Sequence, residues 1–330
     1  MNTLDVNGLH VTLPGPGQRR QRTVLRDVSF SVAPGEALGL VGESGSGKSM
    51  TLKAVLRMLP TGSRTEGAVR FEDDDVYGMD ARALRTYRSH RIAMIHQDPR
   101  TAVNPVRRVG DFLTEGLVLT HGLRRREAAA RMVRALADVG IADGERRMAQ
   151  YPHELSGGLL QRVMIAAALA TGPRLLLADE PTTALDVTTQ QEVMGILDAL
   201  RRERGLAMVF VTHDLDLAAA VTDRVAVMYA GTIVETGPSA DLHHHAAHPY
   251  TAGLLRARPV IGSRTRPAPL PGRPVSAFEA GDGCGFADRC TYAQDACRAI
   301  RPALAPLGTH TTACHRAQEL ADTHALEPAS

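Results

Sequence analysis

Residues 42 to 49 are "GESGSGKS", and this stretch decides the fold class. It fits the pattern G-x-x-x-x-G-K-[ST] and follows "ALGLV", a short apolar run that predicts a buried strand. Small residues let backbone N–H groups point into one concavity, which can hold the phosphates of a nucleotide together with the N-terminus of the next helix. We expect Lys48 to neutralise the outer phosphates and the Ser49 hydroxyl to ligate Mg²⁺. A flexible Gly/Ser turn is the plain alternative. The residues expected to form this phosphate loop are Gly42, Glu43, Ser44, Gly45, Ser46, Gly47, Lys48 and Ser49.

A second apolar run, "LLLADEP" at residues 175 to 181, ends in two carboxylates. The carboxyl ends of parallel strands lie at one edge of a sheet, so this pair is expected beside the phosphate loop. Asp179 would hold Mg²⁺ through its water shell, and Glu180 would orient the attacking water as a general base. Taken alone, an acidic pair at a strand end can be merely solvated, but the phosphate loop favours a catalytic role.

The pattern of apolar residues divides the chain into three regions. Short β-rich runs precede residue 95, helical spacing covers about 106 to 170, and strands then alternate with helices. Beyond residue 257 the Pro and Gly content rises, as in "RPAPLPGRPV". We therefore predict an α/β nucleotide-binding domain over residues 1–257 with a helical subdomain at about 98–172. A Pro-rich linker and a small Cys-containing C-terminal extension would occupy residues 258–330.

Composition argues against some functional classes. The 330 residues carry a net charge of +2 with both signs interspersed, which gives no support to a broad nucleic-acid-binding face. No apolar run approaches the roughly 20 residues that span a bilayer, and no signal peptide is recognisable at the first residues. We expect a soluble chain that stays in the cytoplasm.

The stretch "LSGGLLQR", residues 155 to 162, makes a family identifiable. With the two motifs above, the chain resembles the nucleotide-binding subunits of ABC transporters. In that family this motif contacts the ATP bound by a partner subunit, which implies a role here for Ser156, Gly157 and Gly158. Leu159 replaces the family's usual Gln, a mild departure because the backbone and Ser156 would make the contacts. Without the family, "ELSGG" is a helix start capped by a serine.

The resemblance extends to three further positions, in the family's order. Gln97 in "IHQDP" is similar to the glutamine that senses Mg²⁺ and the γ-phosphate. Asp186 in "ALD", residues 184 to 186, is similar to the aspartate of a loop that reaches across the dimer. His213 in "VFVTHD" is similar to the histidine that contacts the γ-phosphate, although a lone histidine at a strand end is more often a surface group.

One expected feature is missing. Many family members stack adenine on an aromatic residue some twenty positions before the phosphate loop, and "GPGQRRQRTVLRD", residues 15 to 27, contains none. Since a guanidinium can stack on a base, Arg22 is the candidate, followed by Arg19 and Arg20. Solvated arginines on a loop are the alternative.

The four cysteines fall in the last fifty residues, at Cys284, Cys290, Cys297 and Cys314. This segment has too few apolar residues for a core of its own, so something else must order it. Disulfides seldom persist in the cytoplasm, and four thiolates can bind zinc or an iron–sulfur cluster. "HPYTAGLL", "LPGRPV" and "CGFADRC" together resemble the extension of oligopeptide and dipeptide importer subunits, which implies a 4Fe-4S cluster. Zinc, free thiols or disulfides are the alternatives.

We expect the histidines of "DLHHHAAHPY" to form a surface turn.

The resemblance implies an ATPase that powers import of peptides or a related small solute. The partners would be two transmembrane permease subunits, a second and distinct ABC ATPase subunit, and an extracytoplasmic substrate-binding protein, with no nucleic acid. The chain would sit at the cytoplasmic face of the membrane. A soluble ABC ATPase that acts on DNA or the ribosome is the competing class, and an iron–sulfur enzyme that binds nucleotide is a third.

Overall fold

The computed structural model describes residues 1–15, 21–183, 185–242, 244–258 and 269–326. The chain forms two compact units. The first unit comprises residues 1–4, 32–36 and 78–210, and the second unit comprises residues 5–31, 37–77 and 211–330. The chain therefore passes between the units more than once.

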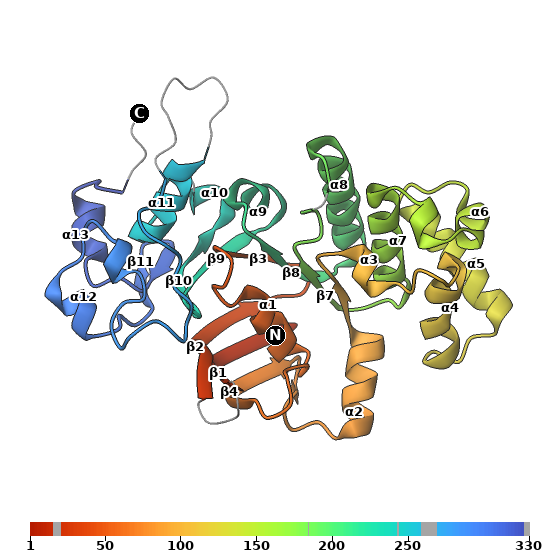
Figure 1. Cartoon of the computed structure of the whole chain (residues 1–330), viewed down its shortest axis with the longest axis horizontal. Helices are drawn as coiled ribbons and strands as arrows, with labels where there is room; N and C mark the ends of the chain where they lie inside the picture. The colour runs from red at the N-terminus through yellow and green to blue at the C-terminus, as the bar shows by residue number, and fades with distance from the viewer. Residues whose placement is uncertain (16–20, 184, 243, 259–268, 327–330) are drawn as a thin grey trace. The chain divides into compact units, whose positions relative to one another are not determined.

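Strands and helices follow one another along both units (Figure 1). The strands are β1 (Leu4–Pro14), β2 (Gln21–Val32), β3 (Ala37–Val41), β4 (Arg64–Phe71), β5 (Asp74–Asp75), β6 (Ile92–Ile95), β7 (Leu175–Asp179), β8 (Ala207–Thr212), β9 (Arg224–Tyr229), β10 (Thr232–Pro238), β11 (Ala305–Leu307) and β12 (His310–Thr312). The α-helices are α1 (Lys48–Val55), α2 (Ala81–Thr86), α3 (Pro99–Ala102), α4 (Val109–Leu119), α5 (Arg125–Asp138), α6 (Gly144–Ala149), α7 (Gly157–Ala170), α8 (Val187–Arg204), α9 (Leu215–Val221), α10 (Ser239–Leu242), α11 (Pro249–Ala257), α12 (Asp295–Ala299) and α13 (Ala317–Asp322). Short helical turns are η2 (Tyr87–Arg91), η3 (Pro152–Glu154) and η4 (Ala287–Arg289).

The first unit contains a parallel strand pair covered by helices. β6 and β7 run parallel, with Ile92 opposite Leu175 and Ile95 opposite Ala178. Every residue of β7 is buried, as expected for a parallel strand covered on both faces. α7 packs against β6, and α8 packs against α7. The predicted strand before the two carboxylates is confirmed, and it ends at Asp179.

Helices α4 to α7 pack on one another within the first unit. α5 buries Ala128, Met132 and Leu136, spaced four residues apart, which is the single apolar stripe that helical spacing predicts. The predicted change to helical structure after residue 106 is therefore confirmed.

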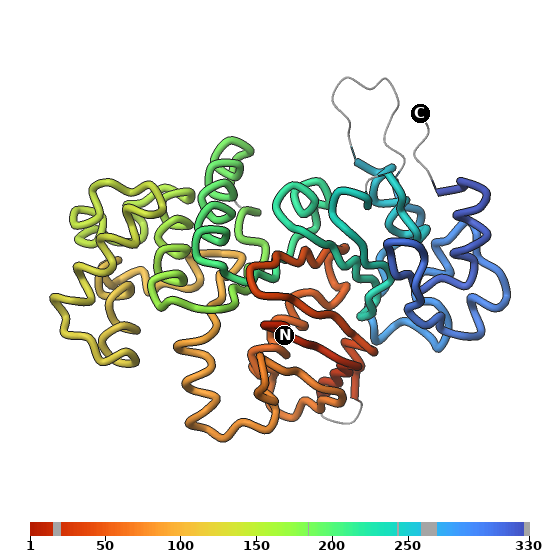
Figure 2. The backbone as a smooth tube through the Cα atoms, turned by 180° about the vertical axis from the view of Figure 1, so that it is seen from behind, coloured from red at the N-terminus to blue at the C-terminus, as the bar shows by residue number. Residues whose placement is uncertain are grey.

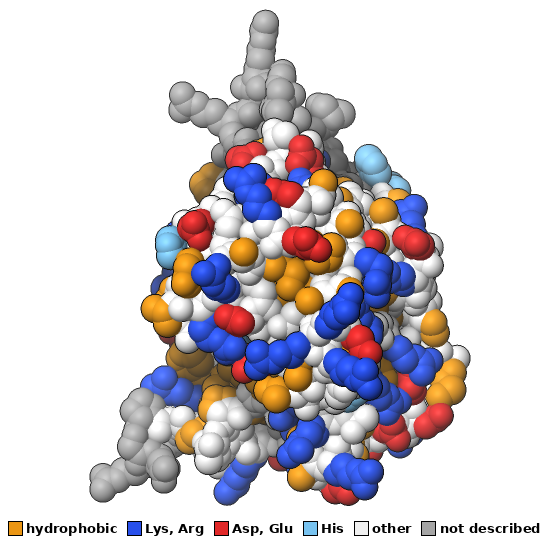
Figure 3. All heavy atoms as spheres, turned by 90° about the vertical axis from the view of Figure 1, so that its right-hand side faces the viewer, with side chains coloured by type: hydrophobic (Ala, Val, Ile, Leu, Met, Phe, Trp, Pro, Cys, Tyr) orange, Lys and Arg blue, Asp and Glu red, His pale blue; other side chains and the backbone are white. Residues whose placement is uncertain are grey.

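Figure 3 shows Lys and Arg side chains interspersed with Asp and Glu on the face it presents. Among the described residues, no helix combines the length and apolar character needed to cross a bilayer.

The second unit contains two groups of strands. β2, β1, β4 and β5 form a four-stranded sheet in that order. In the other group, β3 runs parallel to β9, with Leu40 opposite Ala226, and β9 pairs antiparallel with β10. β3 is completely buried and leads directly into the phosphate loop and α1, as predicted.

The C-terminal extension (described residues 269–326) joins this second group of strands. β12 pairs antiparallel with β10, with Glu235 opposite Thr312, and β11 pairs with β12. Phe286 of the extension enters a core cluster with Tyr229 and Tyr250. Leu320 of α13 and Ala252 of α11 belong to one small core cluster. Figure 2 traces the extension in blue next to the cyan segment that contains α11. Strand pairing and a shared core are therefore among the contacts outside the extension's own small core that order this segment, as the shortage of apolar residues led us to expect.

Candidate functional site

The phosphate loop bends between β3 and α1. Gly47 caps the N-terminus of α1 with φ at 111°, a left-handed conformation that favours glycine. A Cβ atom on Gly42 would lie 2.2 Å from the backbone oxygen of Met228, so a side chain there would collide with β9. The backbone conformation at Gly47 and the close approach at Gly42 therefore both require glycine. The loop has a defined conformation and is not a flexible Gly/Ser turn.

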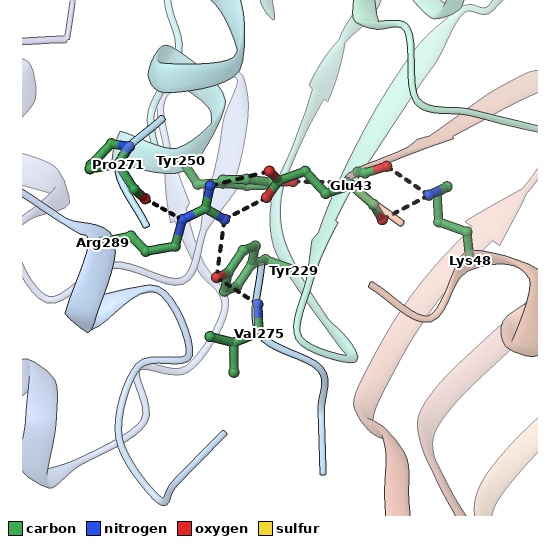
Figure 4. A network of polar contacts seen from close by, with 8 residues as sticks. Glu43, Lys48, Tyr229, Tyr250, Pro271, Val275 and Arg289 are labelled. Carbon is green, nitrogen blue, oxygen red and sulfur yellow. Dashed lines mark hydrogen bonds and ion pairs between the residues drawn. The ribbon is translucent and has the colours of Figure 1, made fainter. Parts of the chain in front are cut away.

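Lys48 is the first residue of α1, and only 5% of its surface is exposed. Its Nζ donates hydrogen bonds to the carbonyl oxygens of Gly42 at 2.6 Å and Glu43 at 3.1 Å (Figure 4). A buried ammonium group must find acceptors inside the protein. Phosphate oxygens are stronger acceptors for a cation than carbonyls, so an entering phosphate can take over these bonds.

Two predicted catalytic side chains meet in the first unit. Gln97, which follows β6, donates from Nε2 to Glu180 Oε2 at 3.1 Å. Thr183 Oγ1 donates to the same carboxylate oxygen at 3.0 Å. Glu180 has φ at 45°, a left-handed value that costs energy in a residue other than glycine and is often found at functional sites. Asp179, at the end of β7, is 8% exposed. The Glu180 carboxylate is therefore oriented by protein contacts, and Asp179 is buried beside it in sequence.

Two helix N-termini lie together in the same unit. Ser156 caps α7, and its Oγ accepts from the backbone N–H of Leu159 at 3.4 Å. Asp186 caps α8 by accepting from the N–H and hydroxyl of Thr189 at 3.0 and 2.8 Å, and these bonds lower its pKa. A Cβ atom on Gly158 would lie 2.5 Å from Thr189 Cγ2, so Gly158 permits this close approach. Gly157 is partly exposed beside the Ser156 cap. Ala184, in the predicted "ALD" stretch, lies outside the described residues.

His213 follows β8 and is exposed. The next residue, Asp214, donates its backbone N–H to Thr212 Oγ1 at 3.0 Å and caps α9. His213, Ser49 and the rest of the phosphate loop belong to the second unit. Gln97, Asp179, Glu180, Ser156 and Asp186 belong to the first.

Arg22, the predicted base-stacking residue, lies at the exposed start of β2. Its guanidinium carbon is 5.1 Å from the ring centroid of Phe278 in the C-terminal extension. Arg19 and Arg20 lie outside the described residues. Phe278 was missed from the sequence because it is more than two hundred positions from the phosphate loop.

An ion pair between the extension and the phosphate loop was also missed. Arg289, 6% exposed, donates from Nη1 to Glu43 Oε2 at 2.6 Å and from Nη2 to Oε1 at 3.1 Å (Figure 4). Arg289 also donates to the Pro271 carbonyl and to the hydroxyl of Tyr229. On the other side, the backbone N–H of Glu43 donates to the Tyr250 hydroxyl at 3.0 Å. The first variable position of the motif is therefore held by the extension.

The four cysteines line one cavity together with Phe286, His248 and Arg316. They form no disulfide. Burial raises the pKa of Cys284 and Cys290, and it raises that of Cys314 to about 11. Within the part of the chain that the structure describes, no group of three or more His, Cys, Asp or Glu side chains is arranged to hold a metal ion.

The expectation of a surface turn is wrong for His248. It is 1% exposed and caps α11 by accepting from the N–H of Tyr250 at 3.0 Å. The backbone N–H of His248 donates to Oε2 of the fully buried Glu235 at 2.9 Å, and burial lowers the pKa of the imidazole to about 4. The turn is buried here because the buried Glu235 carboxylate accepts hydrogen bonds from the backbone N–H groups of Ala247 and His248. His244 and His245 are exposed as expected, and His243 lies outside the described residues.

Two family models match parts of this chain. A family model described as "ABC transporter" matches residues 25–183, and one described as "Oligopeptide/dipeptide transporter, C-terminal region" matches residues 234–297. The chain is 42% identical to the oligopeptide transport ATP-binding protein OppD of Salmonella typhimurium, covering 96% of this chain and 94% of that protein. It is also 42% identical to a putative peptide import ATP-binding protein of Brucella ovis, covering 96% and 98% of the two chains.

Solved structures share the fold. The dimeric structure of MJ0796, a bacterial ABC transporter cassette, matches with a TM-score of 0.63 and 27% identity. The match covers 72% of this chain and 98% of the cassette. A post-hydrolysis state of the same cassette, bound to ADP and Pi, matches with the same TM-score.

Proposed function

This chain belongs to the ABC transporter ATP-binding family, in its oligopeptide and dipeptide branch, and from that premise we infer that it hydrolyses ATP to drive peptide import through a membrane permease. The observation that carries the inference is a phosphate loop with its lysine already buried, within a chain similar to peptide import ATPases over nearly its whole length. It is supported by an α/β cassette fold with a helical subdomain and a small extension.

The roles of the site residues follow from their chemistry. Lys48 and the N–H groups of the phosphate loop bind the phosphates, and Mg²⁺, held by Ser49, Gln97 and Asp179, would neutralise charge on them. Glu180 takes a proton from the attacking water. The bond from Gln97 to Glu180 supports this assignment because it orients the carboxylate that must accept the proton. His213 contacts the γ-phosphate.

A second subunit completes the site. Ser156, Gly157 and Gly158 at the start of α7 bind the γ-phosphate of the nucleotide held by the partner, and Asp186 contacts the partner's loop. Support comes from the adjoining N-termini of α7 and α8, because helix N-termini favour anions. The dimeric form of the similar cassette points the same way. The partner ATPase is a distinct but related chain, so the pair is a heterodimer.

The working assembly contains two permease subunits and receives its peptide from an extracytoplasmic binding protein. This chain lies at the cytoplasmic face of the membrane as a peripheral subunit. Closure of the ATPase pair on ATP moves the permease, and hydrolysis reopens it. A soluble ATPase acting on DNA or the ribosome is the competing class.

Cys284, Cys290, Cys297 and Cys314 would hold a 4Fe-4S cluster in the cavity they line, with zinc as the alternative metal. The donor set fits, because four thiolates are the usual ligands of such a cluster and all four line one cavity. Among the described residues, the four cysteine side chains are not arranged as the ligands of a metal centre. The proposal therefore rests on the chemistry of the four thiols and on the cavity that they share. The cluster's role is structural, since it would add crosslinks to a segment with a small core.

The test of the transport function is purification of the chain in mild detergent from cells that also express its permease subunits, followed by assay in proteoliposomes. We expect the permease to be retained and ATP hydrolysis to rise when binding protein and peptide are added. Retention of ribosomes or DNA in place of the permease would refute the transport function and support the competing class.

A further inference from the structure

Phe278 is an aromatic side chain that the proposed function does not use. It is 48% exposed, although it lies in a short turn of the extension. Single exposed apolar residues are common and need no explanation by themselves. What distinguishes Phe278 is that the turn carrying it approaches the phosphate loop through Ser276, two residues earlier.

The turn that carries Phe278 lies close to the phosphate loop and to β2. A Cβ atom on Gly45 would lie 3.8 Å from Ser276 Oγ. The next residue, Ala277, approaches Gly231 so closely that a Cβ atom there would lie 2.5 Å from the Ala277 Cβ. The Ala277 carbonyl accepts from Arg26 Nη2 of β2 at 3.3 Å. Phe278 follows Ser276 and Ala277 and lies against Arg22 at the start of β2.

Polar contacts hold this turn in place. The N–H of Ser276 donates to Glu279 Oε2 at 3.1 Å, and Arg273 donates to Glu279 Oε1 at 2.9 Å. The N–H of Val275 donates to the Tyr229 hydroxyl, which also accepts from Arg289, the residue that binds Glu43 (Figure 4). The turn and the phosphate loop are therefore joined through one network.

Arg22 adds a second planar group. Its guanidinium lies over the Phe278 ring at 5.1 Å, a distance at which a cation and a ring attract each other. The sequence of residues 15 to 27, which includes Arg22, contains no aromatic residue, so Phe278 supplies the ring that this segment lacks. Aromatic rings bind nucleobases by stacking on the base π-face, without a requirement for a particular base.

We propose that Phe278 stacks on the adenine base of ATP bound at the phosphate loop, so that the C-terminal extension supplies the base-binding part of the site. Arg22 packs on the ring and fixes its orientation. The inference rests on the proposed function, because it assigns one part of the same ATP site. It also assigns the extension a direct role in nucleotide binding.

The test compares a ligand that has a base with one that has none. Binding of Mg-ATP and of Mg-tripolyphosphate to the full chain is measured by calorimetry or by competition with a fluorescent ATP analogue. For Phe278→Ala we expect the Kd for ATP to rise about tenfold, which corresponds to the loss of one stacking contact, and the Kd for tripolyphosphate to stay unchanged. Phe278→Tyr keeps the ring and should keep ATP affinity. Ile300→Ala, which removes another exposed apolar side chain of the extension, is the matched control and should change neither.

Two outcomes would overturn the assignment of Phe278. One is unchanged ATP affinity in Phe278→Ala. The other is an equal loss of affinity for ATP and tripolyphosphate, which would mean that the ring only supports the loop. If the wild-type chain bound neither ligand, the proposed function would fall and this inference with it. Wild-type ATP binding separates the two failures.

Discussion

The phosphate loop and the C-terminal extension obtain their shapes from different kinds of contact. Lys48 binds the carbonyls of Gly42 and Glu43, which are 6 and 5 positions away along the chain. Arg289 of the extension binds Glu43 across 246 positions. The contacts of Lys48 within the loop are therefore local in sequence, whereas the extension depends on contacts with a cassette far from it in sequence. Since Glu43 belongs to both sets of contacts, a change in the extension should alter the affinity of the phosphate loop for ATP.

The largest effect is expected from a change that leaves the extension alone. Glu180→Gln keeps the shape of the side chain and its contact with Gln97, but the amide cannot accept a proton. We expect kcat for ATP hydrolysis to fall at least about a hundredfold with ATP binding retained. The matched control is Glu203→Gln, which changes an exposed carboxylate on α8 and should leave kcat unchanged. Normal turnover by Glu180→Gln would remove Glu180 from the role of base.

The second effect tests whether the extension acts on the loop. Arg289→Ala leaves the Glu43 carboxylate partly buried without its partner, which should lower the free energy of unfolding by about 3 kcal/mol. The unpaired negative charge also lies next to a site for anions, so the Kd for ATP should rise about tenfold. Chemical denaturation and calorimetry measure the two quantities.

Two further variants of this region serve as controls. Adding Glu43→Gln to Arg289→Ala removes the unpaired charge and should recover part of the lost ATP affinity. Arg298→Ala breaks an exposed pair with Asp288 in the same extension and should cost less than about 0.5 kcal/mol. If Arg298→Ala weakened ATP binding as much as Arg289→Ala, the ion pair to Glu43 would not be the cause.

The same difference explains what the sequence could predict. The strand before the phosphate loop, the strand that ends at Asp179 and the Ser156 cap of α7 follow from residues close together in the chain, and the structure confirms these elements. Arg289 and Phe278 could not be found in this way, because nothing near them in sequence indicates that the extension returns to the loop. The hydrogen-bond geometry between Glu180 and Gln97 likewise appears only when β6 and β7 pair.

A third effect concerns the cysteines. Protein isolated without oxygen should be brown and contain roughly four iron atoms per chain if one 4Fe-4S cluster is bound. Cys314→Ser should lose the colour and lower the thermal midpoint. ATP binding should persist, because β12–β10 pairing and the contact between Arg289 and Glu43 involve no cysteine side chain. One zinc per chain without colour would assign the site to zinc, and protein without either metal would contradict a metal site.

The smallest effect is expected at Leu159, where the family's usual Gln is absent. The contact seen at this position is a hydrogen bond from the backbone N–H of Leu159 to Ser156 Oγ, and a new side chain leaves that donor in place. Leu159→Gln should therefore change the ATPase rate of the assembled transporter by less than about twofold, which is below 0.5 kcal/mol in the barrier. Ser156→Ala is the comparison, because it removes the cap itself, worth about 1 kcal/mol, together with the hydroxyl proposed to contact the partner's nucleotide. A large gain in rate from Leu159→Gln would show that the side chain, in addition to the helix N-terminus, acts at the dimer interface.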